Sequence, residues 1–214
     1  MAGILDLVGP ALAGDTLGQL SRAIGADERA TQRAATAALP VILGALNRNA
    51  STPSGAEALA RALDRDHDGG LLDHLGGFLG GLAGGERAPA AGRDLPDVSA
   101  RTTNGAGILG HVFGDRLPRV EEGVARATGL DRGQVLQLLI ALAPLVLGAL
   151  GRVKRERNLD ARGLPDVLGT EAARARDAAP SDLLGTVAGF LDRDGDGNPM
   201  DDVAGMLGGF LRRR

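Results

Sequence analysis

Two acidic segments punctuated by glycine contain the residues whose types and spacing could do chemistry. Residues 64–69 and 192–197 both follow the pattern D-x-D-x-D-G, and each is followed by a further aspartate, Asp73 or Asp201. Three carboxylates at alternate positions around a tight turn suit a hard cation such as Ca²⁺, which takes about 6–8 oxygen ligands. The predicted ligands, with Gly70 contributing its backbone carbonyl, are Asp64, Asp66, Asp68, Gly70, Asp73, Asp192, Asp194, Asp196, Asn198, Asp201 and Asp202.

Neither segment is a complete EF-hand loop. That loop places ligands at positions 1, 3, 5, 7 and 9 and a bidentate glutamate at position 12, whereas position 12 here is Leu75 or Val203. We expect Asp73 and Asp201 to close shortened loops instead. The alternative is a solvated acidic turn in which these two aspartates cap the next helix. Like charges around one turn repel unless a cation neutralises them, and the pattern occurs twice, so Ca²⁺ binding is favoured, with the second segment the better site.

Enzymatic constellations are absent from the sequence. There is no cysteine or tyrosine, and none of the three histidines, His67, His74 and His111, stands in a zinc-protease or serine-hydrolase motif. A hard cation prefers oxygen, so we expect His67 and His74 to be exposed bystanders. The sequence therefore predicts a non-enzymatic protein that uses Ca²⁺ for structure or to regulate assembly.

Charge and hydropathy limit the other classes of partner. The net charge is −3, which gives no basic face for nucleic acid, although residues 154–157 form a small basic cluster. The longest apolar run, residues 135–150, is shorter than the roughly 20 residues of a membrane span, so we expect a buried, kinked helix. The N-terminus does not resemble a signal peptide, which favours a cytoplasmic location.

The two halves of the chain resemble each other. Gly25-Ala26-Asp27 matches Gly129-Leu130-Asp131, and the apolar segment 39–46, which contains Pro40, matches 143–150, which contains Pro144; both pairs are 104 residues apart. The acidic segments are 128 residues apart, so the second half carries about 24 additional residues, around 152–180. We predict two related repeats, 1–83 and 106–214, joined by a flexible linker over 84–105.

Helical periodicity dominates both repeats, and no β alternation is visible. Each begins with one helix of apolar spacing, 5–24 in the first repeat, then a short turn with Asp27 or Asp131 as the N-cap. A longer apolar helix follows with proline at its centre, which indicates either a shared kink or a helix that ends and restarts. A further helix, 57–63 or 182–191, leads into the acidic loop. The predicted fold is all-α: two helical repeats, each with an EF-hand-like loop.

Glycine recurs after each acidic segment. Pairs at 76–77, 80–81 and 84–85 recur every four residues, and the second half has Gly205, Gly208 and Gly209. A side-chain-free stripe on a helix allows close packing within the monomer, which we favour, or against a second copy, a helical protein partner or a membrane surface.

Residues 141–152, with Gly107-Ile108-Leu109 upstream and 191–197 downstream, resemble the YidB-like bacterial family, domain of unknown function 937. The second half matches the family's pattern well, and the first half matches it only in its general features. The resemblance implies a helical, homeodomain-like fold, present here as two tandem divergent copies, and it implies no established activity. A DNA-binding module is therefore the runner-up function.

Overall fold

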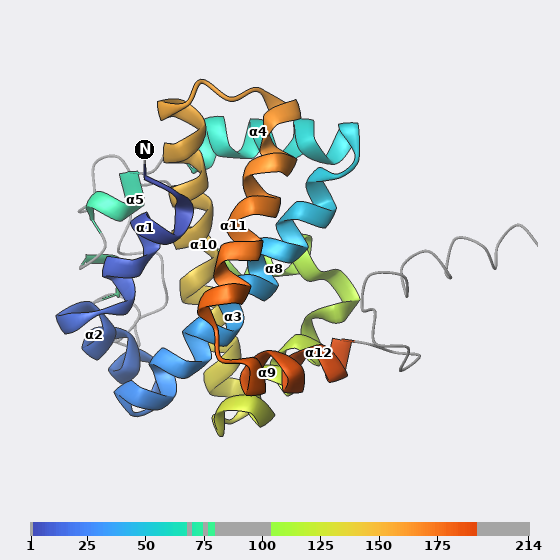
Figure 1. The fold of residues 1–214 in the computed structure, drawn as a ribbon. Helices are drawn as coiled ribbons and strands as arrows, with labels where there is room; N and C mark the ends of the chain where they lie inside the picture. Colours follow the sequence, from blue (N-terminus) through green and yellow to red (C-terminus); the bar gives the residue numbers. More distant parts are fainter. Residues whose placement is uncertain (1, 68–69, 75–76, 80–103, 192–214) are drawn as a thin grey trace, which may run out of the picture.

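The computed structural model describes residues 2–67, 70–74, 77–79 and 104–191 (Figure 1). Within these ranges the chain is helical and contains no β-strand, which confirms the all-α prediction. The elements are α1 Ile4–Val8, η1 Gly9–Leu12, α2 Gly14–Ile24, α3 Glu28–Ala50, α4 Pro53–Asp66, α5 Gly70–Asp73, α8 Gly105–Phe113, η2 Gly114–Arg116, α9 Leu117–Thr128, α10 Arg132–Glu156, η3 Ala161–Gly163, α11 Leu164–Ala178 and α12 Ser181–Leu191.

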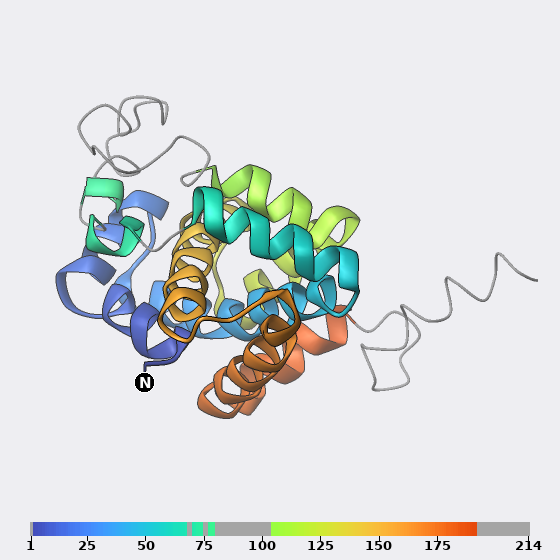
Figure 2. The ribbon, with the colours of Figure 1, turned by 90° about the horizontal axis from the view of Figure 1, so that it is seen from above.

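The two long helices, α3 and α10, organise a core to which both halves of the chain contribute. Leu138, Leu139, Leu142 and Leu145 of α10 are 0–1% exposed and belong to one hydrophobic cluster that runs from Ile4 to Val187. Helix α11 lies along α3, and α12 lies against α9 (Figure 1). Seen from above, α3 runs between α4 and α11 (Figure 2). By length and composition alone α10 could cross a membrane, but 72% of its most apolar 18-residue window is buried inside the fold.

The predicted caps of the long helices are confirmed. Asp27 accepts a hydrogen bond from the backbone N–H of Ala30, and Asp131 accepts one from Gln134, whose side chain returns a bond to the Asp131 N–H. The preceding glycines, Gly25 and Gly129, adopt positive φ angles of 68° and 81°, a conformation that carries little penalty for glycine. The same turn therefore starts both long helices.

Both long helices run without a break through their prolines. The alternative in which each helix ends and restarts at Pro40 or Pro144 is therefore wrong. Proline has no N–H, so Pro144 leaves the carbonyl of Ile140 without its helical donor. Gly105, the first residue of α8, lies directly on that carbonyl: a Cβ at Gly105 would overlap the Ile140 oxygen. The proline thus creates a place where a second backbone approaches α10 closely.

The first helix predicted for 5–24 is wrong as a single element. The chain forms α1, then the 3₁₀ turn η1 with Pro10 near its start, and then α2, which begins at Gly14 with a φ of +56°. Proline at the start of a turn and glycine in the left-handed region both interrupt an α-helix. The apolar spacing persists across the break because Val8, Leu17, Leu20 and Ile24 all reach the core.

The polar stretch that makes the second half longer forms structure of its own. It contains η3 and the 15-residue helix α11, whose buried residues include Leu164, Leu168 and Ala172. Since α11 packs on α3 of the first half, this insertion joins the two halves. Gly105, the last residue of the predicted linker, is the first residue of α8; residues 84–103 lie outside the described residues.

A buried carboxylate on α11 holds the start of α1. Glu171 is 4% exposed; its Oε2 accepts a hydrogen bond from the Leu5 N–H at 3.0 Å, and its Oε1 accepts one from Arg174 at 2.8 Å. Arg174 also reaches Asp6 at 3.5 Å. The first backbone donors of a helix have no partner within the helix, so Glu171 satisfies one of them from a distant part of the chain.

Asp6 makes the α1 contact sensitive to acid. A hydrogen bond from the Gly3 N–H chiefly lowers the pKa of Asp6; partial burial opposes this, and the charge of Arg174 adds to it. A lowered folded-state pKa contributes stability above the ordinary value of 3.8, and this contribution is lost as the pH falls through the folded-state value. Urea unfolding should therefore separate the wild type from Asp6→Asn at pH 7, and the difference should shrink as the pH falls below 3.8. A difference that is constant with pH would contradict this.

Candidate metal centre

The first acidic segment lies at the junction between α4 and α5. Asp64 and Asp66 belong to the last turn of α4, Gly70 is the first residue of α5, and Asp73 is its last. Asp68 lies outside the described residues. The segment thus lies between two helices, and α4 extends three residues further than its predicted end at Leu63.

The carboxylates at the two ends of this segment contact cations from α10. The ammonium of Lys154 lies 2.6 Å from Asp64 Oδ1, and Arg152 Nη2 lies 2.7 Å from both carboxylate oxygens of Asp73. The aspartate side chains are 56% and 61% exposed, whereas those of Lys154 and Arg152 are only 13% and 25% exposed. Two negative charges of the predicted ligand set are therefore balanced by the C-terminal part of α10.

The described carboxylates do not converge on one point. Asp64 and Asp66 are two residues apart on a helix, so their side chains project from different faces. In the described part of the chain, no group of three or more histidine, aspartate or glutamate residues could hold a metal ion. For the predicted ligands to meet around one cation, the last turn of α4 must change conformation.

The prediction that His67 is exposed is wrong. This residue ends α4 and is 4% exposed, and His74 is half-buried. Sequence reasoning placed both histidines on a polar loop, whereas the end of α4 turns His67 inward toward the core.

The second acidic segment follows α12 directly. Helix α12, Ser181–Leu191, covers the predicted helix 182–191. All six of its predicted ligands lie outside the described residues: Asp192, Asp194, Asp196, Asn198, Asp201 and Asp202. Most of the glycine ladder, including Gly205, Gly208 and Gly209, also lies outside them; of its first part, Phe78 and Leu79 are buried in the core and Gly77 is exposed.

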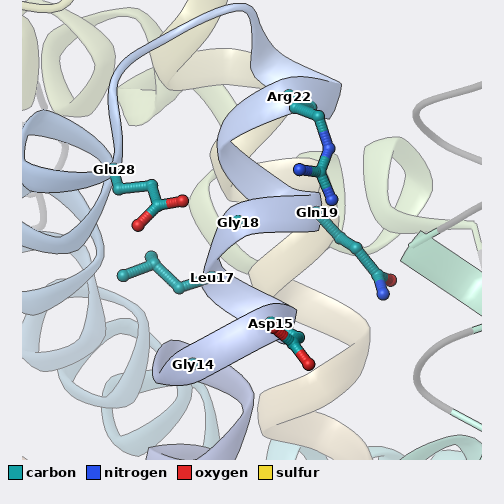
Figure 3. Close-up of a pocket in the computed structure, with 7 residues that line it drawn as sticks. All are labelled: Gly14, Asp15, Leu17, Gly18, Gln19, Arg22 and Glu28. Carbon is teal, nitrogen blue, oxygen red and sulfur yellow. The ribbon is translucent and has the colours of Figure 1, made fainter.

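A polar pocket beside α2 was not anticipated from the sequence. It has a volume of about 410 Å³ and is lined by Gly14, Asp15, Leu17, Gly18, Gln19, Arg22 and Glu28. Figure 3 shows Asp15, Gln19 and Arg22 projecting from one side of α2, with Glu28 approaching from the start of α3. A Cβ at Gly18 would lie 3.0 Å from Glu28 Oε1, so glycine permits this approach. The lining contains both acidic and basic side chains, and no pair of residues in it could act as a nucleophile and its general base.

Arg48, in the last turn of α3, lies near enough to Arg116 of η2 for the two charges to interact. Burial lowers the pKa of Arg48, and the nearby charge of Arg116 lowers it further. The sequence carried no signal for this pair because its members are 68 positions apart and only the packing of the helices brings them together.

A comparison with known protein families identifies the family to which the chain belongs. A model described as a bacterial protein of unknown function, DUF937, matches residues 6–153. The chain belongs to this family. The DUF937 match begins in α1 and ends within α10, so it includes the first acidic segment and leaves out α11, α12 and the second segment. It is a single match that does not separate two copies, so tandem duplication stays a prediction. A search of curated proteins and a search of solved structures each gave no match.

Proposed function

We propose that this DUF937 protein is a non-enzymatic helical protein that binds Ca²⁺ through its two acidic segments and uses the metal to regulate its assembly or its binding to a helical protein partner. The observation that carries the proposal is the repeated D-x-D-x-D-G pattern, each copy placed directly at the C-terminal end of a helix, α4 or α12. Asp64 and Asp73 each contact a cation of α10, so both carboxylates lie where a positive charge can reach them.

We further propose that the two halves are divergent copies of one helical repeat. Helix α3 begins at Glu28 and α10 at Arg132, which is the 104-residue spacing found in the sequence. Glycines of positive φ, aspartate N-caps and internal prolines recur at the same spacing. A homeodomain-like arrangement of each copy is part of this proposal.

The basic cluster at 154–157 gives little support to DNA binding. Lys154 is paired with Asp64, and Arg157 donates a hydrogen bond to the backbone carbonyl of Ala2 at 3.1 Å. Lysine and arginine side chains bind duplex DNA through its phosphates, and these two already serve contacts within the chain. We therefore do not propose nucleic acid as the partner, and a cytoplasmic location remains our expectation.

Isothermal calorimetry on chelator-treated protein tests the proposal. Titration with Ca²⁺ should give two binding events, and Asp192→Ala/Asp194→Ala should remove one of them. Mg²⁺ should bind more weakly, because it demands strict octahedral geometry and gives up its water reluctantly. The matched control is Asp115→Ala/Asp177→Ala, which removes two exposed aspartates outside both segments and should leave both events unchanged. The absence of heat and of any Ca²⁺-dependent shift in melting would refute the proposal.

A further inference from the structure

Asn104 and Gly105 form the only asparagine–glycine pair in the chain, and the fold has a use for each residue. Asn104 is the N-cap of α8, where its Oδ1 accepts a hydrogen bond from the Gly107 N–H at 3.0 Å. Gly105 is the first residue of α8, and a Cβ there would overlap the Ile140 carbonyl oxygen. Asparagine is among the preferred N-cap residues, and glycine alone has no Cβ. The cap and the close packing on α10 thus place these two residues next to each other.

An asparagine that precedes glycine can react with its own main chain. Asparagine is one of the thermolabile residues of proteins. The Gly105 nitrogen loses its proton and bonds to Asn104 Cγ, and the side-chain nitrogen leaves as ammonia, which closes a cyclic succinimide. Water then opens the ring: attack at the former side-chain carbonyl gives aspartate, and attack at the main-chain carbonyl gives isoaspartate. The net change consumes water, releases ammonia and replaces an amide by a carboxylate.

The structure leaves both reacting groups available and places one restraint on them. Asn104 is exposed, so water reaches its amide. The Gly105 N–H is among the first donors of α8, which have no carbonyl partner within the helix, and glycine has no side chain to shield its nitrogen. The restraint is the cap, which holds the amide against Gly107: a Cβ at Gly107 would lie 3.0 Å from Asn104 Cγ. Ring closure on Gly105 therefore requires the cap to open.

We propose that Asn104 is a site of spontaneous deamidation, and that opening of the first turn of α8 sets its rate. Local opening of a helix end costs less free energy than unfolding of the whole domain. The reaction therefore proceeds in the folded population, at a rate that depends on the strength of the cap.

The two products differ in their effect on the fold. Aspartate keeps an oxygen at the N-cap and adds a negative charge at the N-terminus of α8, which is favourable. Isoaspartate routes the main chain through the side chain and inserts an additional carbon atom directly before Gly105. This insertion shifts Gly105 from its contact with the Ile140 carbonyl, so isoaspartate loosens α8 from α10.

Ageing of the full-length protein at mildly alkaline pH, followed by peptide mass spectrometry, tests the site. The peptide that contains Asn104 should gain the mass difference between an amide and an acid several-fold faster than the peptides of the other four asparagines, Asn47, Asn49, Asn158 and Asn198. Asn104→Ser keeps an N-cap oxygen but has no amide, so its peptide should not change. After chromatographic separation, the isoaspartate form should unfold at lower urea concentration than the aspartate form.

Gly107→Ala tests whether the cap sets the rate. The added Cβ would lie 2.6 Å from Asn104 Nδ2, so it pushes the amide off the cap. Loss of one N-cap raises the open population about fivefold, and deamidation should accelerate by the same factor. The matched control is Gly110→Ala, which gains the same helix propensity, meets nothing within 4 Å and should not accelerate the reaction. Deamidation of Asn104 no faster than that of the other asparagines would overturn the proposal, as would equal rates in the two alanine variants.

Discussion

Gly105→Ala should lower the free energy of unfolding by about 1–3 kcal/mol, the usual cost of forcing an additional group into a packed interior. The new methyl group would overlap the Ile140 carbonyl oxygen, which is backbone of the central helix α10 and has no rotamer by which to move aside. The chain contains no tryptophan or tyrosine, so the measurement is urea unfolding followed by far-ultraviolet circular dichroism.

Gly110→Ala is the matched control in the same helix. Gly110 is exposed, and a Cβ there would meet nothing within 4 Å. Alanine in a helix interior is favoured over glycine by up to about 1 kcal/mol, so this variant should be more stable than the wild type. The two identical substitutions, five residues apart, should therefore have opposite signs. A Gly105→Ala protein as stable as the wild type would show that α8 does not pack on the freed carbonyl.

Glu171→Gln should also destabilise the fold, by about 1.5–3 kcal/mol, the range for hydrogen bonds to a charged group. The carboxylate accepts from the Leu5 N–H with one oxygen and from Arg174 with the other. Glutamine retains only one oxygen, so its amide N–H₂ must face one of these two donors. The loss should be concentrated at α1, where hydrogen exchange of residues 4–8 should rise more than that of α3.

Glu122→Gln serves as the comparison, because Glu122 also pairs with an arginine, Arg126, at 2.7 Å but is 32% exposed at its side chain. A helical i,i+4 pair of this kind contributes about 0.3–0.5 kcal/mol. An effect of Glu171→Gln no larger than that of Glu122→Gln would mean that the buried carboxylate does not hold α1 in place.

The predictions for Gly105 and Glu171 concern contacts between residues that are far apart in the sequence. Gly105 touches a carbonyl that only the internal proline makes available, and Glu171 satisfies a helix terminus 166 positions away. Local pattern reasoning works because caps, periodicity and turn glycines depend on neighbours within a few positions. These patterns correctly predicted the caps Asp27 and Asp131, where the deciding interactions are local.

Sequence patterns mispredict the structure in two places: where apolar periodicity and helix-breaking residues conflict, and where helix packing decides which side chains are buried. The apolar spacing of residues 5–24 suggested one helix, yet Pro10 and Gly14 interrupt it while the core still receives the same side chains. His67 was assigned to an exposed loop by its acidic neighbours, but α4 continues through Asp66 and carries His67 inward. In the first case proline and glycine outweighed the apolar periodicity; in the second, the packing of α4 placed a polar side chain inside the fold.

The sequence by itself determined the helical class, the start of each long helix and the two acidic segments, because these follow from local periodicity, capping and charge. Only the tertiary structure decided that the polar insertion forms α11 against α3, and that α10 presents Lys154 and Arg152 to Asp64 and Asp73. The physical reason is that a contact across 79 or 90 positions depends on how whole helices bury their apolar faces together, and no local pattern specifies this packing.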